Sequence, residues 1–151
     1  MIEVNNLTTI SANEGFFKKV AKKVLDGEKK RKLETSIAIV GEEKIKELNK
    51  KYRKKNQATD VLSFFYGDSG EVVLCLQQVR KNAKKYKSTF KKESARVLIH
   101  GILHLLGEDN EKTKRESKRV EETKVYSSPF AAARVMAEKE NYYLKLCRKI
   151  L

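Results

Sequence analysis

The sequence has few of the residues that build disulfide scaffolds, cysteine metal sites or membrane segments. Its two cysteines, Cys75 and Cys147, are too few and too far apart for a disulfide framework or a C-x-x-C site. We therefore expect both thiols to be reduced and buried. No apolar run approaches the roughly 18 residues of a membrane span, and the N-terminus lacks the basic and apolar regions of a secretory leader. These absences predict a soluble, cytoplasmic protein without a membrane segment.

Acidic residues are scarce relative to basic ones. The chain has 34 lysines and arginines against 20 aspartates and glutamates, and its formal net charge is +14. A field of that sign favours polyanions, most simply RNA or DNA, while an acidic protein or a membrane surface stays open as a partner. The length of 151 residues suits one domain with a buried core, and no internal repeat is visible. We expect a single domain over residues 1–151.

The spacing of apolar residues predicts an alternation of strands and helices. Apolar and β-branched stretches predict strands at residues 2–10, 35–40, 58–66 and 71–76. The last two strands flank a Gly-Asp-Ser-Gly turn, which predicts that they pair antiparallel. Apolar residues with helical period predict helices at residues 14–27, 42–52, 77–87, 88–106, 111–125 and 128–150. We expect residues 126–151 to form a C-terminal helical extension, whose apolar stripe favours core packing over a dimer contact.

The stretch V-L-I-H-G-I-L-H-L-L-G-E-D-N, residues 97–110, holds the only two histidines of the chain, His100 and His104. Side chains four apart share one face of a helix, so both imidazoles can point at one metal ion. The helix is apolar nearly all round, which predicts burial. A buried polar pair is costly without partners, and a metal would supply one. Two satisfied core histidines remain the alternative interpretation.

The residues after the histidine pair extend the resemblance to a metal site. Gly107 stands where a helix that must end and reverse favours a residue with positive φ. A turn there could carry position 110 back toward the histidines, as in the H-E-x-x-H-x-x-G-x-x-H zinc proteases. However, Gly101 stands where those proteases keep their general-base glutamate, and Asn110 stands where they keep the last histidine. The pattern predicts the ligand spacing of such a site without the general base of a protease.

Three sequence blocks resemble the YbeY family of bacterial endoribonucleases and rRNA maturation factors. The family motif H-G-x-L-H-L-x-G-(Y/F/H)-D-H is matched by H-G-I-L-H-L-L-G-E-D-N at residues 100–110. The second block, L-N-x-x-Y-R followed by T-D-V-L-S-F, is matched at 48–53 and 59–64, and the third, G-(D/E)-I-x-(I/L)-(C/S), is matched at 70–75. Phe65 replaces the family's proline after S-F, and the chain after about residue 126 extends past the motif-bearing region.

The resemblance implies an α+β domain: a small mixed sheet covered by helices, with a central buried helix that carries the HGxxH motif in a metzincin-like site. It also implies one metal ion, usually zinc, held by three histidines. By position, His100 and His104 carry over as metal ligands, and Asn110 occupies the place of the third. An amide oxygen is a poor zinc donor, so the carboxylate of Asp109 or Glu108 is the substitute ligand.

Arg53 matches the family's functional arginine, although in K-K-Y-R-K-K alone it would read as a surface cation. Its planar guanidinium fits a phosphate bidentately. With Arg53, His100 and His104 as catalytic residues, the leading hypothesis is a metal-dependent, single-strand-specific endoribonuclease of rRNA maturation and ribosome biogenesis. Its partners would be rRNA and the ribosome or ribosomal proteins. Lysines in residues 80–92 would add salt-sensitive affinity for the RNA backbone.

Two rival hypotheses keep parts of the same pattern. In the first, the chain is a ribosome-associated RNA-binding factor whose metal site has been lost through Asn110. In the second, it is a zinc peptidase, which shares the ligand spacing. Gly101 cannot act as a general base, so the peptidase ranks last.

Overall fold

The computed structural model describes residues 1–117 and 129–151, and the side chains of residues 1–107 and 134–151. The four strands predicted from the sequence form, with ends shifted by a few residues. They are β1 (Ile2–Asn6), β2 (Glu34–Ile39), β3 (Val61–Phe65) and β4 (Ser69–Leu74). The helices are α1 (Glu14–Gly27), α2 (Glu42–Arg53), α3 (Leu76–Lys85), α4 (Phe90–Ser117) and α5 (Pro129–Leu146), followed by the 3-10 helix η1 (Arg148–Ile150).

The strands form one mixed sheet in the order β1-β2-β4-β3. β1 and β4 both run parallel to β2, whereas β3 pairs antiparallel with β4. Gly67, in the turn between β3 and β4, has a φ of 94°, a conformation that glycine adopts without strain. The antiparallel pairing and the small mixed sheet of an α+β fold are as the sequence predicts.

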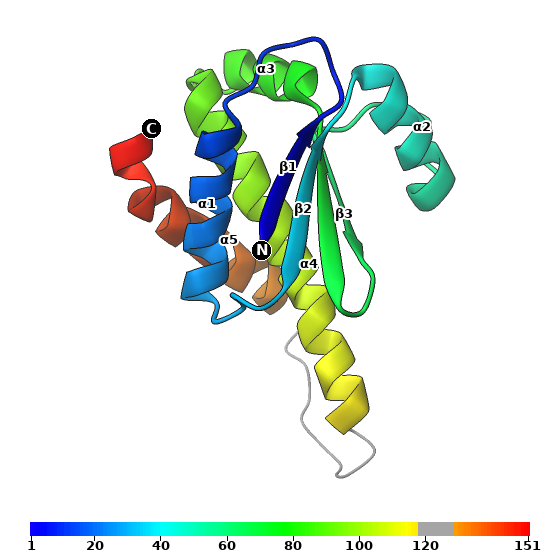
Figure 1. Cartoon of the computed structure of the whole chain (residues 1–151), viewed down its shortest axis with the longest axis vertical. Helices are drawn as coiled ribbons and strands as arrows, with labels where there is room; N and C mark the ends of the chain where they lie inside the picture. The colour runs from blue at the N-terminus through cyan, green and yellow to red at the C-terminus, as the bar shows by residue number, and fades with distance from the viewer. Residues whose placement is uncertain (118–128) are drawn as a thin grey trace.

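The two faces of the sheet bury alternate residues of each strand, as the period of two in a strand requires. Ile37 and Ile39 of β2 belong to the larger core cluster, which is built with α1 and α4. Ala38, between them, belongs to a smaller cluster that also contains Ile45 of α2. Figure 1 shows α1 and α4 on one side of the sheet and α2 on the other. The sheet therefore separates α2 from the main helical layer.

The first half of α4 is the central helix that the sequence predicts. Leu98, Ile99, Ile102 and Leu105 are fully buried against the sheet and the neighbouring helices. Gly101 lies at a close approach of α4 to the sheet. A Cβ there would lie 2.8 Å from Val61 Cγ2 and 2.9 Å from Val72 Cγ1. Side chains of the sheet thus occupy the space that a general-base side chain at position 101 would need.

The helix end predicted at Gly107 is wrong, because α4 continues through it to Ser117. Gly67 is the only glycine with positive φ in the described part of the chain, so Gly107 does not form the predicted turn. No atom of the described residues lies within 4 Å of where its Cβ would be, so no described contact forces a reversal. An interior helical glycine costs only about 1 kcal/mol. The side chains of Asp109 and Asn110 lie outside the described residues. Residues 111–117 of the helix predicted at 111–125 belong to α4, and the rest lie outside as well.

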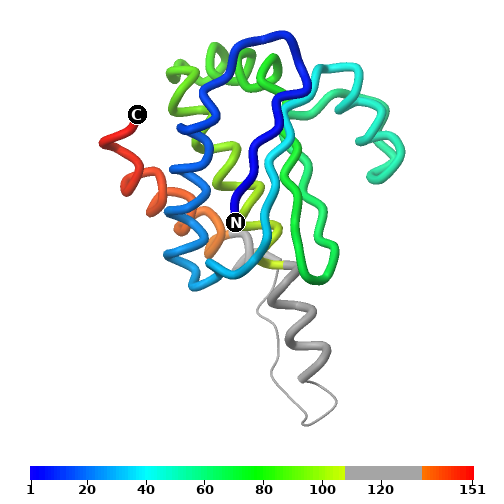
Figure 2. Tube along the Cα trace, viewed as in Figure 1, coloured from blue at the N-terminus to red at the C-terminus, as the bar shows by residue number. Residues whose placement is uncertain are grey.

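The C-terminal helix α5 packs against α1 and α4, and Figure 2 traces it back beside α1. Tyr143 is buried, and its hydroxyl donates to Glu28 Oε2 at 2.6 Å. Lys139 Nζ donates to Glu28 Oε1 at 2.5 Å. Tyr143 and the buried, unpaired thiol of Cys147 join the main core cluster, so the apolar stripe of this helix packs in the core, as favoured from the sequence.

The other cysteine is placed as predicted, because Cys75 is a fully buried free thiol that directly follows β4. Within the residues that the structure describes, no helix combines the length and the apolar character that a membrane crossing requires.

Candidate active site

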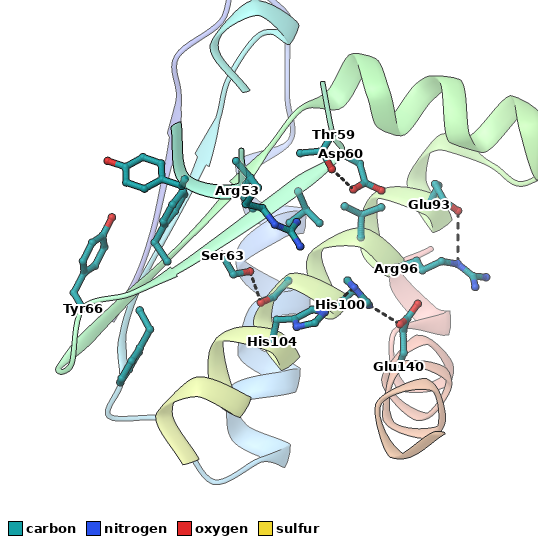
Figure 3. A pocket seen from close by; sticks show the side chains of 17 residues that line it. Arg53, Thr59, Asp60, Ser63, Tyr66, Glu93, Arg96, His100, His104 and Glu140 are labelled. Atoms are coloured by element: carbon teal, nitrogen blue, oxygen red, sulfur yellow. Dashed lines mark hydrogen bonds and ion pairs between the residues drawn. The ribbon is translucent and has the colours of Figure 1, made fainter. Parts of the chain in front are cut away.

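An open pocket of about 690 Å³ lies where the end of α2, strand β3, α4 and α5 meet. Figure 3 shows the labelled side chains that converge on it from these elements. Arg53 comes from α2 and Ser63 from β3, whereas Glu140 comes from α5. The α4 helix contributes both histidines. The pocket therefore collects residues from segments that are far apart in the sequence.

The two histidines face each other across one turn of α4. Their Nε2 atoms lie 3.0 Å apart, and the rings meet edge to face with centroids 4.5 Å apart. His104 is exposed, and the side chain of His100 is 41% exposed. The pair lies at the pocket surface and not inside the core. The alternative of two satisfied core histidines is therefore wrong.

A carboxylate is hydrogen-bonded to the second ring nitrogen of His100. The Nδ1 atom of His100 lies 3.1 Å from Oε2 of Glu140, whose side chain is 18% exposed. This hydrogen bond raises the pKa of His100, against the opposing effect of burial. Burial lowers the pKa of His104, and the nearby charges of His100 and Arg53 lower it further. The two rings are thus chemically distinct, although they are one helical turn apart.

The geometry of the pair fits two ligands of one metal ion. Two imidazole nitrogens that bind zinc at about 2.0–2.1 Å in a tetrahedral site lie about 3.3 Å apart, close to the 3.0 Å between the two Nε2 atoms. Glu140 contacts Nδ1 of His100, on the opposite side of the ring, and does not face the position between the two Nε2 atoms. No group of three or more His, Cys, Asp or Glu side chains is arranged for a metal within residues 1–107 and 134–151. The described side chains therefore supply two zinc donors, the Nε2 atoms of His100 and His104.

Arg53 reaches the pocket because α2 ends directly after it. Lys54, the next residue, adopts a left-handed conformation with φ of 57° and closes the helix. The Arg53 side chain is exposed, lines the pocket and lies close enough to lower the pKa of His104. Figure 3 shows it on the far side of the pocket from Glu140. The structure thus brings together Arg53, His100 and His104, which the sequence singled out separately.

Arg96 is a pocket residue that sequence reasoning missed. It stands four residues before His100, so it continues the same face of α4. The spacing R-x-x-x-H-x-x-x-H was visible and could have identified it. Its Nε lies 3.6 Å from Oε2 of the buried Glu93, whose pKa is raised mainly by burial. Glu140 was also missed, and nothing near it in the sequence marks it.

A second hollow joins the predicted basic segment to this pocket. It has a volume of about 600 Å³ and is lined in part by Lys87, Lys92 and Arg96. Both lysines are exposed. Arg96 lines both hollows, so a basic surface leads from the start of α4 to the histidine pair.

The sequence pattern of a family described as Endoribonuclease YbeY matches residues 3–128 of this chain. A protein of that name from Petrotoga mobilis is 37% identical over 122 residues, which cover 78% of this chain and 85% of the relative. Those from Thermodesulfovibrio yellowstonii and Thermotoga petrophila are each 44% identical, over 56% of this chain. The aligned region spans 58% and 59% of these two relatives, respectively, which is less than two thirds of their length.

A solved structure has the same fold. The solution structure of TM1509 from Thermotoga maritima superposes with a TM-score of 0.60 at 28% sequence identity. The alignment covers 96% of this chain and 87% of TM1509. The similarity therefore includes the C-terminal part of the chain as well as the motif-bearing region.

Proposed function

This chain belongs to the YbeY endoribonuclease family, and from that premise we propose that it is a metal-dependent endoribonuclease. Its proposed substrate is single-stranded RNA, chiefly rRNA during maturation in the cytoplasm, with the ribosome or ribosomal proteins as partners. One observation carries the proposal: His100, His104 and Arg53 converge on one open pocket. The adjoining basic surface favours a polyanionic substrate.

The chemistry assigned to each residue follows from its position. His100 and His104 would hold the metal, which we propose to be zinc, through their facing Nε2 atoms. When bound, the metal supplies Lewis acidity at a phosphoryl oxygen and activates water. The Arg53 guanidinium binds the scissile phosphate and stabilises the charge that develops on it. The resemblance puts a third ligand at Asn110 or Asp109, but the continuation of α4 through Gly107 removes the turn on which that ligand depends.

Exposed aromatic side chains on the same pocket favour unpaired RNA. Tyr52 and Tyr66 line the pocket and are 57% and 62% exposed. Bases that are free of a duplex can stack on such rings, and each stacking contributes about 1–3 kcal/mol. A paired base has no free face to offer. This supports a single-stranded substrate.

The test compares cleavage of a labelled single-stranded RNA with cleavage of the same RNA in a duplex. We expect His100→Ala to abolish cleavage and Arg53→Ala to slow it about 100-fold, as the loss of a transition-state donor does. Lys46→Ala is the matched control, because Lys46 is an exposed cation on α2 outside the pocket. Treatment with a chelator should stop cleavage, and added zinc should restore it. Equal cleavage by the unaltered chain and His100→Ala would contradict the proposal.

The second candidate function is RNA binding without cleavage. The observation that favours it is that the described side chains supply two metal donors and no third. In that case RNA affinity survives replacement of both histidines but collapses at high salt. The purified chain would also contain no zinc by elemental analysis. Cleavage that depends on His100 would exclude this candidate.

A further inference from the structure

We propose that Glu140 is a positioning residue, which holds the His100 ring so that its Nε2 faces the metal position. The inference rests on the metal site of the proposed function. Glu140 lies on α5 beyond residue 128, where the match to the family ends. Glu140 therefore lies outside the region that the family match covers.

The geometry of the hydrogen bond determines which nitrogen of His100 is free. A neutral imidazole carries one proton, and the nitrogen without it is the metal donor. Because a carboxylate can only accept, Nδ1 of His100 must donate to Oε2 of Glu140, at 3.1 Å. The lone pair then lies on Nε2, which faces Nε2 of His104 at 3.0 Å. Metal-binding histidines commonly have such a partner on the second nitrogen, and it also increases their basicity.

The packing of α5 fixes where Glu140 stands. Lys139, its neighbour, and Tyr143, one turn further on, both donate to the carboxylate of Glu28 at the end of α1. Gly27 makes room for this contact, because a Cβ there would lie 2.5 Å from the Tyr143 hydroxyl. The carboxylate of Glu140 is thus carried by a helix that is anchored on both sides of it. A rigid support of this kind is what a positioning residue needs.

Zinc affinity of the purified chain tests the proposal without any measurement of activity. We expect Glu140→Gln to weaken zinc binding about tenfold and Glu140→Ala up to about 100-fold, the range seen when such partners are removed. The matched control is Glu138→Gln on the same helix, whose side chain is 67% exposed and pairs with Arg134. This control should bind zinc as tightly as the unaltered chain. Zinc titrations by calorimetry, with thermal unfolding measured in parallel, give these values.

A second readout separates positioning from simple support of the fold. In the folded, zinc-free chain with labelled histidine, at a pH at which both rings are neutral, nitrogen NMR should show His100 protonated at Nδ1. Glu140→Ala should give a mixture of Nδ1-protonated and Nε2-protonated rings, whereas Glu138→Gln should not change the spectrum. If Glu140→Ala does not fold, the Glu140→Gln variant decides by the same two measurements.

The outcomes distinguish this inference from the proposed function. If the unaltered chain binds no zinc, the metal site and the role of Glu140 are both overturned. If it binds zinc, loses it in His100→Ala and retains full affinity in both Glu140 variants, the metal site stands and the role of Glu140 is overturned. If the unaltered chain and Glu138→Gln bind zinc equally and the Glu140 variants bind it more weakly, the metal site and the role of Glu140 are both supported.

Discussion

Gly101 follows the first histidine and lets α4 approach the sheet closely. Its carbonyl oxygen accepts a hydrogen bond from Ser63 Oγ at 2.7 Å, which ties α4 to β3 next to His100. Any side chain at this position would meet Val61 and Val72, whose branched side chains have little freedom to move away. The placement of the histidine pair therefore depends on the absence of a side chain between them.

We expect Gly101→Ala to lower the free energy of unfolding by about 1–2 kcal/mol. Overpacking against the sheet costs about 1–3 kcal/mol, and the better helix propensity of alanine returns up to about 1 kcal/mol. Urea unfolding measures the difference. A variant as stable as the unaltered chain would show that α4 and β3 separate without cost.

Gly107→Ala is the matched change, and we expect the opposite sign. None of the described atoms lies within 4 Å of its Cβ position, so alanine should stabilise α4 by about 0.5–1 kcal/mol. The same variant tests the course of the chain. Alanine would destabilise a helix end with positive φ, so a loss of stability would mean that the chain reverses at Gly107 after all.

Position 110 gives an independent test of the same point. On a helix that continues through Gly107, Asn110→His should leave the zinc affinity of the unaltered chain unchanged, because the turn that would return it to His104 is absent. Calorimetric zinc titration of the two proteins is sufficient. An affinity gain of tenfold or more would indicate a third histidine ligand and a turn at Gly107.

At the scale of elements, the contact between α1 and α5 depends on one carboxylate. Burial alone would raise the pKa of Glu28, but hydrogen bonds from Lys139 and Tyr143 and the charge of Lys139 outweigh it, so the pKa is lowered. The ionised form is therefore favoured by folding. Its stabilising contribution is fully present above the unfolded-state pKa and is lost as the pH falls through the folded-state pKa.

We expect Glu28→Gln to reduce the free energy of unfolding by about 1.5–3 kcal/mol at pH 7, the usual contribution of hydrogen bonds to a charged group. The difference from the unaltered chain should shrink as the pH is lowered into the acidic range. Glu47→Gln is the control, since Glu47 is exposed on α2 and its nearest cation, Lys44 Nζ, is 3.9 Å away. A pH-independent difference for Glu28→Gln would show that the charge of Glu28 does not stabilise the helix contact.

Across the whole molecule, only some of the lysines that contribute to the net charge of +14 lie near the histidine pocket. Lys87 and Lys92 line the hollow that Arg96 shares with the histidine pocket. Other lysines, such as Lys18 and Lys22, lie on the exposed face of α1, which does not contribute to the pocket. This division predicts which cations a bound RNA strand contacts.

Replacing Lys87 and Lys92 together by alanine should weaken binding of a non-cleavable single-stranded RNA and make it less sensitive to salt. Each lost phosphate contact lowers the slope of log affinity against log salt by about 0.7 for single strands. The double variant of Lys18 and Lys22 has the same loss of charge and should keep the full slope. Fluorescence anisotropy over a range of salt concentrations measures both. Equal slopes for the two double variants would place the RNA elsewhere.

The local features of this protein follow from its sequence alone. Apolar and β-branched stretches predict the strands. Apolar residues with a period of 3.6 predict the helices, because side-chain direction repeats with the helical backbone. The four-residue spacing was enough to place His100 and His104 on one face of α4. Arg53 was identified through the family motif alone, since a single arginine among lysines carries no local signal.

The way in which these residues are brought together depends on tertiary packing. Glu140 reaches His100 across 40 residues of sequence, and Arg53 meets the pair from another helix. The close approach at Gly101 depends on the strands that pack against it. At Gly107, α4 continues and none of the described residues comes within 4 Å of the Cβ position. Residue spacing along one element predicts a shared face. Contacts between distant segments depend on how helices and strands pack, which no local pattern records.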